Sequence, residues 1–405
     1  MNRRAPRIPR RSALAALASG GIAGVAGCLG SVGENPTTSE PNREVPTTGT
    51  AERSRSQFQG SPAHTGRLDA AGPTDDVEVF WRRTPYRYDH SQPVVVGDRV
   101  YVSFAGNLVR LDLATGERRW TADVGHDGSS TPAVRDGTAY VTVWNGGADA
   151  DRGLAAVDVE DGRVTWRGVT DADVTTSPAV TADGVFVGGG FETTTIAAFD
   201  HDGTERWRHD LAEYASTPAV ADGTVVYGAG APRVVAYDAA SGDRQWTADV
   251  DGDATASPTV SDDRVLVGTR AGTLYALDVA DGSEVLTVDL PGSVRRSVAV
   301  ADGRAIVPTE EGLVAVDGDG SRPWTVDAIT AATAPVIAGD VAYLGDGRTV
   351  RALALDDGTE RWAFRTRERS YTDVLLQGVR AAPTVVNGVV LVATQAGDVY
   401  ALGEA

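Results

Sequence analysis

A short motif repeats along this chain and constrains its fold more than any other feature. The clearest copy is LDLATGERRW, from Leu111 to Trp120, and variants of it return about every forty residues until the chain ends. In every copy a glycine lies four residues before a tryptophan or, once, a leucine. The pairs are Gly116/Trp120, Gly162/Trp166, Gly203/Trp207, Gly242/Trp246, Gly282/Leu286, Gly320/Trp324 and Gly358/Trp362. A self-similar period of this length indicates stacked supersecondary units rather than one irregular core.

The residues before each glycine predict a hairpin. An aspartate lies seven or eight residues before the tryptophan or leucine in six copies, at Asp112, Asp158, Asp200, Asp238, Asp278 and Asp317. Its carboxylate can accept hydrogen bonds from backbone N–H groups of the following turn, and the glycine supplies a positive φ. We therefore expect one strand to end at the aspartate and the next to contain the tryptophan.

The fifth copy shows how many strands one repeat holds. Runs of strand-forming residues cover 257–260, 264–269, 273–278 and 284–289, and clusters of glycine, aspartate or serine separate them. Four short antiparallel strands are the unit of a β-propeller blade. Since no stretch after Cys28 has sustained helical periodicity, the sequence predicts an all-β fold of four-stranded antiparallel blades.

The number of blades follows from the tryptophan and leucine positions 81, 120, 166, 207, 246, 286, 324 and 362, which predict an eight-bladed β-propeller. The first position, in Val77 to Trp81, has no aspartate-to-glycine turn before it. The last copy ends at Gly403, where a turn and a fourth strand would follow. We expect the N-terminal strand to pair with this C-terminal blade, which closes the ring and removes an exposed sheet edge.

The N-terminus has the pattern of an export signal. A basic head that includes Arg10 and Arg11 precedes a short apolar run, in a twin-arginine-like arrangement. The run is too short for a typical membrane span, and it leads through small residues to Cys28, which resembles a lipobox cysteine. The alternative is a lone buried cysteine in a membrane anchor.

These features divide the chain into three parts. Residues 1–27 are interpreted as a signal peptide, 28–56 as a disordered tether rich in Ser, Thr, Pro and Glu, and 57–405 as the propeller. Lipid on Cys28 would anchor the protein to the membrane. We therefore expect an extracytoplasmic protein on the outer face of the cell membrane.

The charge of the chain excludes one class of partner. The net charge is −19, and all 37 basic residues are arginine. A surface with this excess of acid disfavours nucleic acid and anionic lipid headgroups, because it offers no surplus of cations to neutralise phosphates. Such a composition is typical of a salt-adapted surface, as in a halophilic organism.

The repeat resembles the tryptophan-docking motif of the pyrroloquinoline-quinone-like (PQQ-like) eight-bladed β-propellers, in their BamB-like lipoprotein branch and of a haloarchaeal type. The resemblance covers residues 57–405. It implies that the tryptophans pack between neighbouring blades and have a structural role; these are Trp81, Trp120, Trp166, Trp207, Trp246, Trp324 and Trp362. Leu286 fills less space than tryptophan, so we expect a softer junction there.

The same resemblance raises the question of quinone chemistry. Quinoprotein dehydrogenases in the family hold calcium through Glu, Asn and Asp, use a catalytic aspartate, and often have a vicinal cysteine pair. Here Cys28 is the only cysteine, so that pair cannot form. The chain also lacks a haem-attaching CxxCH motif, an HExxH metal motif and a GxSxG nucleophile motif. We predict no catalytic residue, no cofactor and no metal site.

Candidate binding residues come from three departures from the repeat, because loops of a propeller vary while its blades stay regular. Trp144 lies off the ring register in an inserted loop. Arg295 and Arg296 replace the Ser/Thr-x-Pro start of an inner strand and would point toward the channel mouth. The long connection 365–380 contains further candidates, namely Arg365, Arg367 and Tyr371. Arginine and aromatic residues are favoured in interfaces. The alternatives are loop packing, a capping segment and local ion pairs.

These observations favour a non-enzymatic scaffold that binds unknown protein partners at the membrane surface. The alternative is a PQQ-dependent dehydrogenase or a small-molecule-binding protein that uses the central channel.

Overall fold

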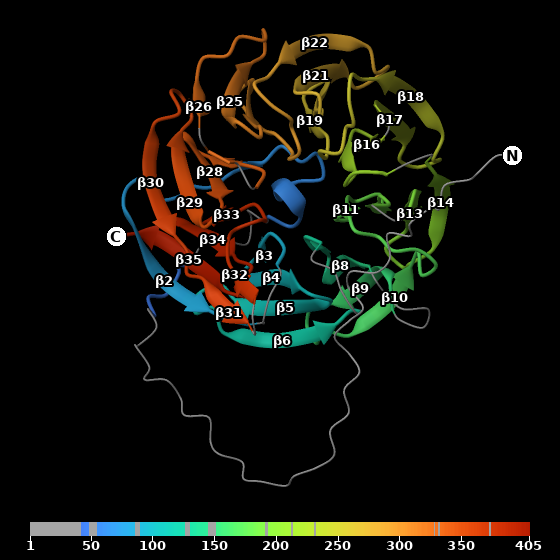
Figure 1. Ribbon diagram of the computed structural model, residues 1–405. Helices are drawn as coiled ribbons and strands as arrows, with labels where there is room; N and C mark the ends of the chain where they lie inside the picture. Colours follow the sequence, from blue (N-terminus) through green and yellow to red (C-terminus); the bar gives the residue numbers. More distant parts are fainter. Residues whose placement is uncertain are drawn as a thin grey trace, which may run out of the picture. The chain divides into compact units, whose positions relative to one another are not determined.

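Short extended segments, separated by glycine and aspartate turns, build a ring of eight β-sheets (Figure 1). The computed structural model describes residues 42–47, 55–85, 90–125, 130–144, 151–190, 193–211, 214–230, 232–327, 329–330, 333–371 and 374–405. The chain forms two units, Met1–Ser39 and Glu40–Ala405, and the first lies outside the described residues. The second unit is an eight-bladed β-propeller, as the repeat predicted.

In blades 1 to 7, four antiparallel strands follow one another in chain order from the channel outward. Blade 1 consists of β3 (Val94–Val96), β4 (Arg99–Phe104), β5 (Asn107–Asp112) and β6 (Arg118–Asp123). Blade 2 consists of β7 (Ala133–Arg135), β8 (Thr138–Val143), β9 (Gly153–Asp158) and β10 (Val164–Gly168). Blade 3 consists of β11 (Ala179–Val180), β12 (Val185–Val187), β13 (Thr195–Phe199) and β14 (Glu205–Asp210). Blade 4 consists of β15 (Ala219–Ala221), β16 (Thr224–Gly228), β17 (Arg233–Asp238) and β18 (Arg244–Asp249).

The second half of the ring repeats this plan. Blade 5 consists of β19 (Thr259–Ser261), β20 (Arg264–Gly268), β21 (Thr273–Asp278) and β22 (Glu284–Asp289). Blade 6 consists of β23 (Ala299–Ala301), β24 (Arg304–Pro308), β25 (Gly312–Asp317) and β26 (Thr325–Asp327). Blade 7 consists of β27 (Val336–Ala338), β28 (Val341–Asp346), β29 (Thr349–Ala354) and β30 (Glu360–Arg365), and β1 (Arg67–Leu68) pairs with β27 in parallel. A small hairpin of β31 (Arg369–Tyr371) and β32 (Val374–Leu376) follows blade 7.

Blade 8 joins the two ends of the propeller. Its first three strands are β33 (Thr384–Val386), β34 (Val389–Ala393) and β35 (Val399–Glu404), and its outer strand is β2 (Val77–Arg83). The antiparallel register of β2 and β35 runs from Val77 opposite Glu404 to Arg83 opposite Val399. The structure thus places the N-terminal strand beside the C-terminal strand, where the sequence predicted closure.

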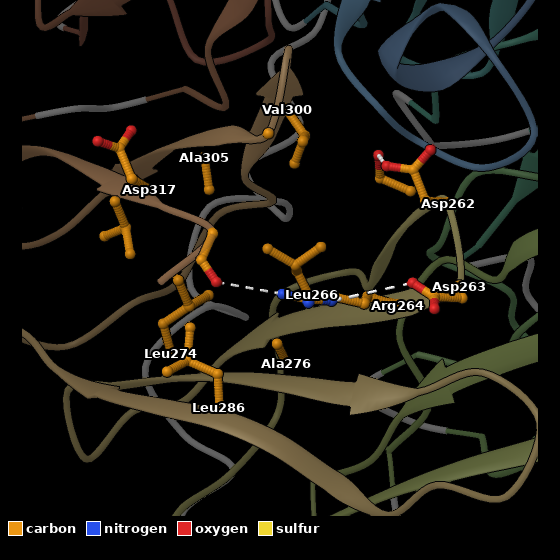
Figure 2. Close-up of a pocket in the computed structure, with 14 residues that line it drawn as sticks. Asp262, Asp263, Arg264, Leu266, Leu274, Ala276, Leu286, Val300, Ala305 and Asp317 are labelled. Carbon is orange, nitrogen blue, oxygen red and sulfur yellow. Dashed lines mark hydrogen bonds and ion pairs between the residues drawn. The ribbon is translucent and has the colours of Figure 1, made fainter. Parts of the chain in front are cut away.

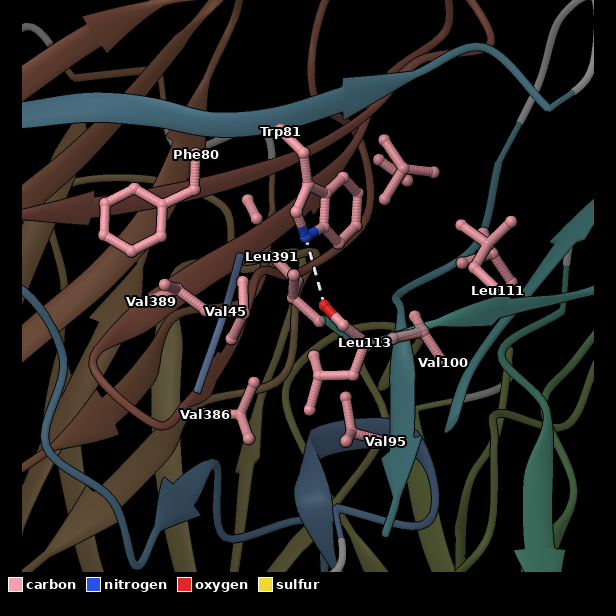
Figure 3. Close-up of a cluster of buried hydrophobic side chains, with 14 of the residues drawn as sticks. Val45, Phe80, Trp81, Val95, Val100, Leu111, Leu113, Val386, Val389 and Leu391 are labelled. Carbon is pink, nitrogen blue, oxygen red and sulfur yellow. Dashed lines mark hydrogen bonds between the residues drawn. The ribbon is translucent and has the colours of Figure 1, made fainter. Parts of the chain in front are cut away.

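The core consists of clusters of buried side chains between adjacent blades. One cluster lies between blades 8 and 1, where the indole of Trp81 is fully buried (Figure 3). Its N–H donates to the backbone carbonyl of Leu113 over 3.1 Å. Because each blade buries its faces against two neighbours, no blade has an independent core.

The N-terminal segment differs from the expected tether. Residues 42–47, within the predicted tether of 28–56, pack against the propeller. Val45 is buried in the cluster between blades 8 and 1 and its N–H donates to the carbonyl of Ala114 over 3.0 Å. Arg43 forms an ion pair with Glu78 over 2.5 Å. Residues 42–47 are therefore not a free tether, because the side chain of Val45 is buried among the apolar residues of this cluster.

The ring has two chemically different faces. The turn face carries the turns between the first and second and between the third and fourth strands of each blade, for example residues 97–98 and 113–117. The loop face carries the links between blades and the connections between second and third strands. The antiparallel order places these two sets of connections at opposite ends of the strands.

Helix is nearly absent from the described ranges: a 3₁₀ turn, η1 (Phe58–Gly60), is the helical element there. Within those ranges there is no helix long and apolar enough to cross a bilayer.

Candidate functional site

The central channel contains a segment that the sequence did not reveal. Residues 55–68, which we call the plug, run past the inner strands of successive blades and include η1, seen at the centre of Figure 1. Backbone N–H groups of the inner strands donate to plug carbonyls over 2.6–3.1 Å; the pairs are Val95 with Arg55, Val134 with Ser56, Val220 with Pro62, Val260 with Ala63, Val300 with Thr65 and Ile337 with Gly66. Blade 3 is bound by the side chain of Gln57, whose amide contacts the backbone N–H and carbonyl of Val180.

Small residues allow the plug to fit into the channel. Gly66 has a φ of +65°, and a Cβ at this position would lie 2.7 Å from the Cβ of Ala299.

His64 is fully buried, and its Nδ1 lies 3.1 Å from the carbonyl oxygen of Pro258. Burial lowers the pKa of His64 to about 4, although the Pro258 hydrogen bond opposes the shift. The neutral ring therefore donates from Nδ1. A weak sequence signal existed in the glycine- and proline-rich run FQGSPAHTG.

On the loop-face side of the plug, the channel contains a cavity of about 600 Å³. We call it the channel pocket. Phe58 of the plug forms part of its lining, and serine and threonine hydroxyl groups line the wall just before the inner strands, including Ser130, Thr176 and Ser257. These residues belong to the Ser/Thr-x-Pro segments that precede the inner strands. In the sequence, the serines and threonines just before these prolines therefore indicate which residues line the pocket.

One side of the channel pocket is cationic. Arg295, Arg296 and Arg380 line it, and its described lining residues include no aspartate or glutamate. Burial, with Arg380 and Arg295 nearby, lowers the pKa of the Arg296 guanidinium. Arg295 forms an ion pair with Glu310 over 2.7 Å, so its charge is partly compensated. The structure thus places Arg295 and Arg296 in the lining of the channel pocket, in the link before β23.

Two further groups of the channel pocket were missed by the sequence analysis. The Nε2 of His90 accepts a hydrogen bond from the backbone N–H of Arg380 over 3.1 Å. Burial, together with the charge of Arg380, lowers the pKa of His90 to about 3. Burial also raises the pKa of the Tyr214 hydroxyl, against the opposing effect of Arg296. A neutral histidine and a neutral tyrosine therefore lie beside the arginines.

The other predicted binding residues are also on the loop face, but not in the channel pocket. Trp144 is half-buried at the end of β8. Arg365 is exposed at the end of β30, and Tyr371 ends β31. Leu375 of β32 is 49% exposed, so the 365–380 connection carries one exposed apolar side chain.

Arg367 contacts the protein itself. Its Nε and Nη2 lie 2.6 and 2.5 Å from the two carboxylate oxygens of Asp398, which is fully buried. Thr84 donates to the same carboxylate over 2.6 Å, and the backbone N–H of Arg367 donates to the Tyr400 hydroxyl. This bidentate pair ties the long connection to blade 8. Arg367 is therefore better explained as an anchor of the loop than as a contact for a partner.

The predicted docking tryptophans lie between blades. Each indole N–H donates to a backbone carbonyl of the neighbouring blade or, for Trp362, to that of Pro73. Blade 8 has no turn between its third and fourth strands, because β35 and β2 come from opposite ends of the propeller. The carbonyl of Pro73, just before β2, accepts the Trp362 hydrogen bond instead. The predicted export and lipid residues Arg10, Arg11 and Cys28 lie outside the described residues.

The residues of the channel do not fit the calcium-bound quinone that the fold resemblance implies. That group requires carboxylate and asparagine ligands, and the described lining of the channel pocket contains neither. Elsewhere in the described ranges, no group of three or more His, Cys, Asp or Glu side chains could hold a metal ion. The channel pocket instead presents hydroxyl groups and guanidinium groups.

The family comparison matches nearly the whole propeller. The family model described as "Outer membrane protein assembly factor BamB" matches residues 64–192, 192–269 and 255–405. Proteins of that name from Bordetella pertussis and Burkholderia pseudomallei are 30% and 26% identical over 141 and 185 residues. These alignments cover 34% and 43% of this chain. The chain spans only 34% and 46% of the length of those two relatives.

Solved structures share the fold at low identity. The quinohemoprotein alcohol dehydrogenase of Comamonas testosteroni has a TM-score of 0.72 and 17% identity, covering 89% of this chain and 82% of that chain. BamB of Moraxella catarrhalis has a TM-score of 0.63 and 17% identity, covering 81% of this chain and all of that chain. At such identities the likeness shows the fold alone.

Proposed function

This chain belongs to the family of the outer membrane protein assembly factor BamB, and from that premise we propose that it is a non-enzymatic scaffold. It binds partner proteins through its loop face, outside the cell membrane. The observation that carries the proposal is the gathering of Trp144, Arg295, Arg296 and the 365–380 connection on one face. The names of the relatives support an assembly role, since they describe assembly factors.

The chemistry of the loop face supports protein recognition. Leu375 is exposed on the β31–β32 hairpin, which also holds Arg369 and follows Arg365 in the chain. Arginines together with an apolar anchor are typical of interface hot spots. The bidentate pair of Arg367 with Asp398 holds the connection to blade 8. A connection held in this way loses less conformational entropy when a partner binds.

Site-specific photo-crosslinking tests the loop face. A photoreactive residue at Leu375 should crosslink a partner protein in intact cells, whereas the same residue at Asp281, in a turn of the opposite face, should not. In a second protein the photoreactive residue replaces Arg365, and in that protein Leu375→Asp should reduce the amount of crosslinked partner. Equal crosslinking from Leu375 and Asp281 contradicts a loop-face scaffold.

Export and lipid attachment form a second part of the proposal. Arg10, Arg11 and Cys28 lie in a twin-arginine-like signal with a lipobox-like end. Cys28→Ser should release the protein from the membrane fraction while it is still exported, because the thioether that carries the lipid cannot form. Replacement of Arg10 and Arg11 by lysine should retain the precursor inside the cell. A Cys28→Ser protein that stays membrane-bound contradicts lipid anchoring.

A second candidate function is small-anion binding in the channel pocket. It is favoured by Arg296 and Arg380 in a lining without described carboxylates. Titration with citrate, a compact anion, should give saturable heat that Arg296→Gln and Arg380→Gln each reduce. Arg99→Gln, at the turn-face end of β4 and away from the channel pocket, should bind citrate as the wild type does. Equal binding by all three variants contradicts this function.

A further inference from the structure

Seven junctions between blades share one arrangement of an indole and a carbonyl. At six of them the tryptophan N–H donates over 2.9–3.1 Å to a turn carbonyl one or two residues after the third strand of the next blade. The acceptors are Leu113, Val159, His201, Ala239, Val279 and Leu355. At the seventh, Trp362 donates to Pro73 over 2.8 Å. An indole therefore fills each of these junctions and satisfies a turn carbonyl.

The junction between blades 5 and 6 lacks this indole. Leu286 occupies the tryptophan position, and a cavity of about 390 Å³ lies beside it. Figure 2 shows Leu266, Leu274 and Leu286 around this cavity, with Ala305 and Val300 of blade 6 opposite. We call it the junction pocket. Blades 5 and 6 keep their positions although the indole is absent, because each is a complete four-stranded sheet and also packs against the blade on its other side.

The carbonyl that the missing indole would contact is still present. By the spacing of the other junctions it belongs to Gly318, which follows Asp317 at the end of β25. Nη1 of Arg264 donates to this oxygen over 3.3 Å (Figure 2). A carbonyl oxygen has two lone pairs, so it can accept a second donor. Arg264 also pairs loosely with Asp263, over 3.9 Å, and its guanidinium lies at the rim of the junction pocket.

The chemistry of the junction pocket favours an uncharged aromatic ring. Its walls are mainly Leu, Val and Ala, while Asp262, Asp263 and Asp317 at the rim disfavour an anion. An apolar cavity left by a smaller side chain loses van der Waals contacts, and such cavities bind small aromatic molecules. The guanidinium of Arg264 can lie against the face of a bound ring.

We propose that the junction pocket between blades 5 and 6 is a binding site for an indole-type aromatic molecule. The ring occupies the space that tryptophan fills at the other junctions, its N–H donates to the Gly318 carbonyl, and Arg264 covers its exposed face. The site is independent of the scaffold proposal, since it opens on the turn face and uses none of the loop-face residues.

Titration calorimetry of the full chain with free indole tests the site. The wild type should bind indole with a saturable, one-site curve. Leu286→Trp should fill the junction pocket with the chain's own side chain, abolish indole binding and raise the melting temperature. Val285→Trp is the matched control, because Val285 is a neighbouring residue that is 46% exposed. It should bind indole as the wild type does.

A second substitution and a second ligand test where and how indole binds. Ala305→Leu, which narrows the junction pocket from the side of blade 6, should also weaken indole binding. The analogue 1-methylindole, which has no N–H donor, should bind about three- to tenfold more weakly, as expected for one lost hydrogen bond. The proposal is overturned if indole fails to bind the wild type, binds Leu286→Trp equally well, or binds no better than its methylated analogue.

Discussion

At the scale of single residues, the docking tryptophans combine burial with a hydrogen bond. The indole of Trp207 is 7% exposed, its N–H donates to Ala239 over 3.1 Å, and its ring stacks with those of Tyr237 and His209. A buried tryptophan removes a large apolar area from water. The tryptophan positions therefore matter for stability between blades rather than for binding.

We expect Trp207→Ala to lower the free energy of unfolding by about 3–5 kcal/mol, since the substitution leaves a cavity between blades 3 and 4. Trp144→Ala, at a half-buried position outside the docking set, should cost about 1 kcal/mol. Urea unfolding of both variants measures the difference. Equal losses would show that the docking position carries no special role.

His64 makes stability depend on pH. Because its pKa in the folded protein is about 4, against 6.5 for an unperturbed histidine, the unfolded chain binds more protons between these values. The contribution of neutral His64 is complete above pH 6.5 and is lost as the pH falls toward 4. At about 1.4 kcal/mol per pKa unit this amounts to about 3 kcal/mol.

His64→Gln should therefore show a shallower loss of stability between pH 6.5 and 4 than the wild type, because glutamine does not titrate there. Unfolding free energies measured across this window provide the test. An unchanged slope in the variant would assign the acid sensitivity to other groups, such as His90, whose pKa is also lowered by burial.

At the scale of elements, the plug and β2 tie the ends of the chain into the ring. The plug crosses the inner strands of blades 1 to 7, and β2 forms the outer strand of blade 8. The plug adds hydrogen bonds to inner strands that would otherwise present unpaired backbone groups to the channel. Both elements therefore hold together blades that are far apart in the sequence.

A chain that begins at residue 69, and so lacks the plug, should lose several kcal/mol of stability, at roughly 1 kcal/mol per lost hydrogen bond. A chain that begins at residue 55 keeps the plug and serves as the control. Thermal and urea unfolding of the two chains give the comparison. Equal stability would mean that the plug only fills the channel.

Deletion of Val77–Arg83 should abolish cooperative melting, because β35 would become an exposed edge and the ring would open. Deletion of residues 369–376, the β31 and β32 hairpin, should leave a single cooperative transition. Calorimetry distinguishes the two. A sharp transition without β2 would show that the ring does not depend on this closure.

At the scale of the whole molecule, the net charge of −19 governs behaviour in salt. The surplus of carboxylates repels itself in the folded state, and at about 1 M salt the screening length shortens to about 3 Å. The melting temperature should therefore rise between about 0.1 and 1 M sodium chloride. A fall over this range would mean that screened ion pairs, such as Arg304 with Asp317, outweigh the repulsion.

The sequence by itself determined the architecture. Period, turn aspartates and glycines are local features, and a blade is built from neighbours in the chain, so the eight blades and the position of β2 could be predicted. The replacement of tryptophan by Leu286 was also visible as a weak junction. The alternation of loops and turns placed the binding candidates on strand ends, but the sequence did not show that they share one face.

Only the tertiary structure decided what fills the channel and what remains open. The plug and Val45 contact strands hundreds of residues away, and no periodic pattern encodes such contacts because they depend on the closed ring. The channel pocket joins Arg296, Arg380 and His90 from three links, and the junction pocket needs walls from two blades. Cavities arise where surfaces from distant residues fail to meet, so their volume and lining appear only after the chain is folded.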